Sequence, residues 1–105
     1  MRVCLKDIAN VIRSKNAGPF ELTFDVLLKD QEMFEKVRQA DVINKRVIAE
    51  LYQIPEADVI SIVYFPNAKA IKATIARPLP SGALGERDVY GAQQHAPLVN
   101  FTFEL

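Results

Sequence analysis

The residue types best suited to chemistry gather near the C-terminus, in a segment without helix or strand periodicity. His95 is the only histidine of the chain, and because an imidazole titrates at about pH 6.5, it is the candidate general acid or base. Asp88 is the candidate to orient it. The neighbouring side chains suited to ligand contacts are Arg87, Tyr90, Gln93 and Gln94. The alternative is that His95 is a hydrogen-bonded loop residue and that the Arg87–Asp88 pair is a solvated ion pair.

A second polar group follows the first apolar stretch and reads Arg13-Ser14-Lys15-Asn16-Ala17-Gly18-Pro19. Its candidate ligand-binding residues are Arg13, Ser14, Asn16 and Gly18, since a guanidinium binds a carboxylate or phosphate bidentately and glycine permits close backbone approach. The four glycines of the chain are Gly18, Gly82, Gly85 and Gly91. All four lie in these two segments, so we expect both segments to converge on one site.

Composition excludes several other kinds of site. Thirteen basic residues balance thirteen acidic ones, whereas a nucleic-acid-binding protein usually carries a basic excess. No apolar run reaches the ~20 residues that span a bilayer, so a cytoplasmic protein without membrane contact is expected. One histidine and one cysteine do not make a conventional zinc site. We expect no metal and no cofactor.

Hydrophobic periodicity predicts the elements that position these residues. We expect helices at 5–14, 30–39 and 41–54, with Asp30 and Asp41 as the N-caps of the last two, and strands at 21–26, 59–65, 69–77 and 98–104. Residues 1–4 are a further short edge strand. The run Val59–Phe65 is dense in β-branched and aromatic residues, which predicts a central strand. Residues 78–97 form a long loop, a length typical of functional segments.

This order predicts an α+β fold in a single domain of residues 1–105. We expect a two-layer sandwich, ferredoxin-like, with helices packed on a mostly antiparallel sheet.

The two polar segments also carry a family resemblance. Residues 13–25 and 87–98 resemble a family of small bacterial proteins filed as a domain of unknown function. That family is similar to the small ferredoxin-fold domain of the AtuA-like (acyclic terpene utilisation) proteins, which carry Arg-Ser-Gly-Asp-Lys-Gly after Leu-Arg-Asp-Leu-Ala. Leu5-Lys6-Asp7-Ile8-Ala9 matches the first motif, and Arg13, Ser14 and Gly18 match the second, from which residues 15–17 depart. The resemblance implies a larger AtuA-like partner encoded nearby, in gene clusters for carboxylic-acid and acyl-CoA catabolism.

Three functions are consistent with the sequence. The first is a small accessory subunit that completes or covers the active site of an AtuA-like two-component enzyme. The second is a stand-alone acid–base lyase or isomerase, in which His95 transfers protons, Arg13 holds a substrate carboxylate and Asp88 orients. The third is a homo-oligomeric module that binds a small carboxylate or acyl-CoA compound without catalysis.

Overall fold

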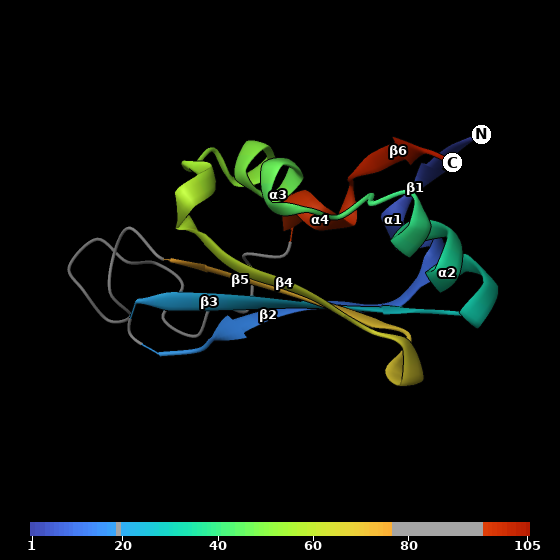
Figure 1. Ribbon diagram of the computed structural model, residues 1–105, viewed down its shortest axis with the longest axis horizontal. Coiled ribbons are helices and arrows are strands. Elements are labelled where there is room, and N and C mark those ends of the chain that lie inside the picture. Colours follow the sequence, from blue (N-terminus) through green and yellow to red (C-terminus); the bar gives the residue numbers. More distant parts are fainter. Residues whose placement is uncertain (19, 77–95) are drawn as a thin grey trace.

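Two layers make up the protein, as the computed structural model shows for the residues it describes, 1–18, 20–76 and 96–105 (Figure 1). One layer is a four-stranded sheet. The other contains the helices and a two-stranded ribbon, all on the same face of the sheet. The predicted α+β domain, with helices packed on antiparallel strands, is therefore confirmed.

The large sheet contains β2 (Ala9–Asn16), β3 (Glu21–Leu28), β4 (Val59–Phe65) and β5 (Ala70–Ala76), in the order β2-β3-β5-β4. Every neighbouring pair is antiparallel. Since β3 and β4 are both antiparallel to β5, they run parallel to each other, and the chain between them crosses over the helical layer. A short 3-10 turn, Pro66–Ala68, joins β4 to β5, as the sequence predicts.

The second layer is built from short elements. Its helices are α1 (Leu5–Ile8), α2 (Gln31–Gln39), α3 (Lys45–Tyr52) and α4 (Ala96–Val99), and its ribbon pairs β1 (Arg2–Cys4) with β6 (Thr102–Glu104). The Asp30 side chain accepts a hydrogen bond from the Met33 amide at 2.7 Å, and the Asn44 side chain accepts one from the Val47 amide at 2.9 Å. These contacts fix where α2 and α3 begin, because they satisfy amides that have no partner inside the helix.

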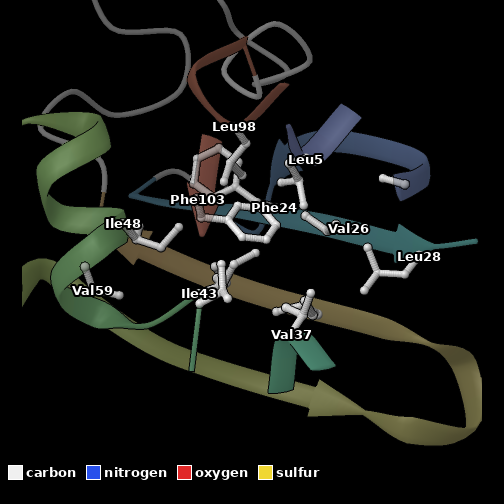
Figure 2. Close-up of a cluster of buried hydrophobic side chains, with 14 of the residues drawn as sticks. Leu5, Phe24, Val26, Leu28, Val37, Ile43, Ile48, Val59, Leu98 and Phe103 are labelled. Atoms are coloured by element: carbon white, nitrogen blue, oxygen red, sulfur yellow. The ribbon is translucent and has the colours of Figure 1, made fainter. Parts of the chain in front are cut away.

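The hydrophobic core lies between the sheet and the helices (Figure 2). Alternate residues of β3 point into it, namely Leu22, Phe24, Val26 and Leu28, as do Ile71, Ala73 and Ile75 of β5. Phe34 and Val37 of α2 and Ile48 of α3 are fully buried in the same core. Burial alternates along β5 and along β3 from Phe24 to Leu28, as in strands covered on one face, whereas Thr23 is buried although it lies on the other side.

The predicted helix over residues 5–14 is wrong, because only Leu5–Ile8 is helical and β2 begins at Ala9. The cause is a β-bulge. Ala9 pairs with Leu28 and Val11 with Leu27, so Asn10 is an extra residue in β2. The bulge places Ala9 and Ile12 on the core side although they are three residues apart, and this spacing imitates the period of a helix.

Other predictions also require correction. Asp41 does not cap α3: it has a positive φ of 51° and lies before Asn44, which is the N-cap. Among the described residues, β4 is an edge strand of the sheet rather than a central one. The predicted strand 98–104 is divided, since α4 ends at Val99 and β6 begins at Thr102. The ferredoxin-like connectivity is not confirmed, because two helices follow β3 before the next strand.

Candidate functional site

The two faces of β2 separate the residues of the first predicted motif. Ser14 lies opposite Phe24 and is buried on the core side, whereas Arg13 lies opposite Asp25 on the outer face. Because successive residues of a strand point to opposite faces, Asn16 shares the side of Ser14 and Lys15 shares the side of Arg13. The structure therefore does not bring Arg13 and Ser14 together in one site.

Arg13 has a carboxylate partner within the chain. Its Nε donates a hydrogen bond to Oδ2 of Asp25 at 3.2 Å. Lys72 lies opposite Asp25 on the next strand, β5, so this carboxylate stands between two cations. A ligand carboxylate that approaches Arg13 would share the guanidinium with Asp25. The sequence analysis did not single out Asp25 as a partner of Arg13. Its outward position in the alternating pattern of residues 21–26 could have indicated that it lies on the outer face of the sheet.

Gly18 shapes the turn between β2 and β3. Its φ is +137°, a conformation that residues with a Cβ rarely adopt. Among the described residues other than its chain neighbours, no heavy atom lies within 4 Å of the position a Cβ would take, so the backbone angle, rather than crowding by these residues, accounts for the glycine. The Ala17 amide donates to the Glu21 carbonyl at 3.0 Å and closes this turn.

The second predicted segment lies outside the described residues. His95, Asp88, Arg87, Tyr90, Gln93 and Gln94 all belong to residues 77–95. Their convergence with Arg13 stays a prediction. Within the part of the chain that the structure describes, no three His, Cys, Asp or Glu side chains are grouped so that they would hold a metal ion.

The outer face of the sheet carries an apolar row that crosses all four strands. Val11 pairs with Leu27, Leu27 with Ala70, and Ala70 with Phe65. We call Val11, Leu27, Ala70 and Phe65 the outer apolar row. Its end members are open to solvent, with Val11 37% and Phe65 44% exposed. The next row on this face contains Arg13, Asp25, Lys72 and Val63, of which only Val63 is apolar. The outer apolar row is therefore a distinct feature of this face.

Two tyrosines hold elements together by hydrogen bonds: Tyr64 joins β4 to the segment between α2 and α3, and Tyr52 joins α3 to α4. Burial raises the pKa of Tyr64, whose hydroxyl donates to the Ile43 carbonyl at 2.8 Å and accepts from the Ile43 amide at 3.2 Å. Burial also raises the pKa of Tyr52, which receives a backbone hydrogen bond from Leu98. Phenols with raised pKa values stay protonated at neutral pH, so both tyrosines act as structural hydrogen-bonding groups.

A shallow depression of about 410 Å³ lies where α2 meets the C-terminus. It is lined by Lys36, Gln39, Ala40, Glu104 and Leu105. The Glu104 carboxylate already contacts the N-terminal amine at 3.3 Å and Arg2 at 3.4 Å. The Glu104 carboxylate is committed to these ion pairs and Lys36 to Glu32 at 3.6 Å, so the described lining offers no convergent set of free charged groups for a ligand.

Comparison with protein families identifies the chain. The model of the family described as Domain of unknown function (DUF4387) matches residues 5–102. The chain belongs to this family. No curated protein and no solved structure matches it. The span that defines the DUF4387 family contains β2 to β5 and both predicted motifs, so the outer apolar row and the Arg13–Asp25 pair lie inside the family domain.

None of the helices within the described ranges has the length and apolar character needed to span a bilayer.

Proposed function

We propose that this protein is the small accessory subunit of a cytoplasmic two-component enzyme in carboxylic-acid or acyl-CoA catabolism. It binds a larger AtuA-like protein through the outer apolar row. The observation that carries this proposal is the row itself: Val11, Leu27, Ala70 and Phe65 lie side by side on the sheet face that the described helices leave open.

The row departs from the usual pattern of such sheets. An antiparallel sheet covered on one face normally turns polar residues outward on the other. Here the outward positions of one complete row are apolar, and Val63 of the next row is 40% exposed as well. Contiguous exposed apolar groups bordered by polar ones are typical of protein–protein contact sites.

The polar residues beside the row suit the rim of an interface. Arg13, Asp25 and Lys72 form the adjacent row and surround the apolar residues on one side. A charged pair at the edge of a contact affects specificity and association rate more than affinity. In this proposal the Arg13–Asp25 pair selects the partner, while Asp88 and His95 contribute to the shared active site.

The choice of partner is supported by sequence motifs. Leu5–Ala9, Arg13, Ser14 and Gly18 match the small ferredoxin-fold domain of AtuA-like proteins. Because of these matches we propose that this chain and the small AtuA-like domain are related. A small subunit that shares ancestry with a fused domain would occupy the corresponding position on a separate large chain.

Co-expression tests the proposal. The affinity-tagged protein is produced together with the AtuA-like protein encoded beside it, and the larger protein is expected to co-purify in stoichiometric amount. Val11→Asp places a charge in the outer apolar row and is expected to abolish co-purification. Phe20→Asp is the matched control, because Phe20 is a large exposed apolar residue outside the row. A complex that survives Val11→Asp, or one lost equally in Phe20→Asp, contradicts docking through the row.

A further inference from the structure

The sheet has two edges among the described residues, β2 and β4, and they differ in charge. Edge strands that stay free are usually protected by charged side chains, proline or bulges, because their unpaired backbone groups attract other strands. β2 carries the cations Arg13 and Lys15. β4 carries no charged residue over Val59–Phe65. One edge is therefore protected by charge and the other is not.

The side chains of β4 are also unusually apolar for an edge. Ile60 is 46% exposed, and Val63 and Phe65 are exposed as well. β4 has a bulge between Val59 and Ser61, but from Ser61 to Phe65 every residue pairs in regular register with β5. Alternate residues of this stretch turn their backbone N–H and C=O groups away from β5, and no strand among the described residues pairs with them there. Exposed, regular and uncharged edge strands of this kind are association sites.

β4 is held in place for such pairing. The Tyr64 hydroxyl bonds both the amide and the carbonyl of Ile43, and Ile62 and Tyr64 pack against the core. A strand fixed by its neighbours loses little conformational freedom when another strand joins it, which favours binding.

We propose that a second copy of this chain covers β4. The two β4 strands pair antiparallel about a two-fold axis and join the two sheets into one of eight strands. Self-pairing places no like charges opposite one another, because β4 has none, and it pairs β-branched and aromatic residues across the axis, a favourable combination.

The opposite edge explains why the assembly stops at two copies. Self-pairing of β2 would bring the cations Arg13 and Lys15 of both copies to one junction, which is unfavourable. The charged β2 edge therefore closes the assembly as a dimer and prevents an open-ended sheet. This inference concerns the edge of the sheet and is separate from docking of a partner at Val11.

Sedimentation equilibrium of the full chain tests the dimer without any partner. The wild type is expected at twice 11.8 kDa, and Ile60→Lys combined with Val63→Lys at 11.8 kDa. Val11→Lys places a lysine at the other edge and is expected to stay dimeric. Far-UV circular dichroism verifies that each variant is folded.

Cross-linking supplies a second readout that does not depend on a disruptive charge. In a Cys4→Ser background, single cysteines placed in turn at positions 61 to 65 are expected to include one that forms a disulfide between copies under mild oxidation, whereas Val11→Cys does not. A monomeric wild type overturns the proposal, whether β4 is covered by residues 77–95, by a partner's strand or by nothing. So does a dimer that persists in the lysine variant or cross-links equally through Val11→Cys. Loss of co-purification in Val11→Asp with an intact dimer leaves this proposal standing, so the two proposals fail separately.

Discussion

Removal of one hydroxyl group, in Tyr64→Phe, is expected to destabilise the whole domain. Tyr64 is on β4, and its hydroxyl is the hydrogen-bonding partner of both backbone polar groups of Ile43. Ile43 lies in the connection between α2 and α3 and is 1% exposed. Phenylalanine keeps the ring and its edge-on contact with Phe34, whose centroid is 6.0 Å away.

The magnitude follows from the groups left without a partner. A buried backbone group that loses its hydrogen bond costs about 1–3 kcal/mol. The 2.8 Å bond to the carbonyl is short, while the 3.2 Å bond from the amide is longer. Since Tyr64 is only half-buried and water reaches part of the site, we expect a loss of about 2 kcal/mol in the free energy of unfolding. For a domain of this size that corresponds to a decrease in Tm of roughly 10 °C.

Urea denaturation at a single protein concentration measures this effect. The midpoint is expected to fall while the slope m stays constant, because the surface exposed on unfolding is unchanged. Tyr64→Leu is the comparison variant: it also removes the ring contact with Phe34 and is expected to cost more. If Tyr64→Phe changes the free energy of unfolding by less than about 0.5 kcal/mol, water replaces the hydroxyl at Ile43 and the reasoning is refuted.

Three further outcomes are expected. Asn44→Ala removes the N-cap of α3 and should cost about 1 kcal/mol in urea denaturation; an unchanged midpoint would mean that water caps the helix equally well. Arg13→Ala should cost less than about 1 kcal/mol, because its ion pair with Asp25 is exposed to solvent on the arginine side; a larger loss would show that Asp25 depends on this partner. The raised pKa values of Tyr52 and Tyr64 mean that the folded state retains protons which the unfolded state loses above about pH 10. The contribution of these two groups to stability should thus be constant below that pH and fall above it, with a smaller fall in Tyr52→Phe, as thermal denaturation across alkaline buffers would show.

Periodicity alone predicted the parts of the fold where a single pattern determines the structure. Residues 21–26 of β3 and 71–75 of β5 alternate between polar and apolar, and both segments are strands with the expected buried face. The helix over 30–39 is confirmed as α2, and Asp30 is its cap. In these segments local pattern, capping and burial agree, which is the condition under which sequence reasoning succeeds.

The features that the sequence did not predict depend on which segments pair in the folded protein. The exposed apolar residues of β4 indicated a central strand, because density of β-branched and aromatic residues does not reveal whether one or two neighbours pair with it. Asp41 and Asn44 both suit a helix cap, and the choice depended on the left-handed backbone at Asp41. Neither distinction is encoded in the residue pattern of the segment itself.

The bulge at Asn10 has the widest consequence for the candidate site. A helix ending near residue 14 would have gathered Arg13, Ser14 and Lys15 around one turn, where they could contact one ligand. A strand divides them between two faces. Whatever approaches the outer face of the sheet meets Arg13 and Lys15, while Ser14 is buried against the core beside Phe24. The residues of the first motif therefore lie on two different surfaces. A ligand that binds Arg13 contacts the outer face of the sheet, where the outer apolar row also lies.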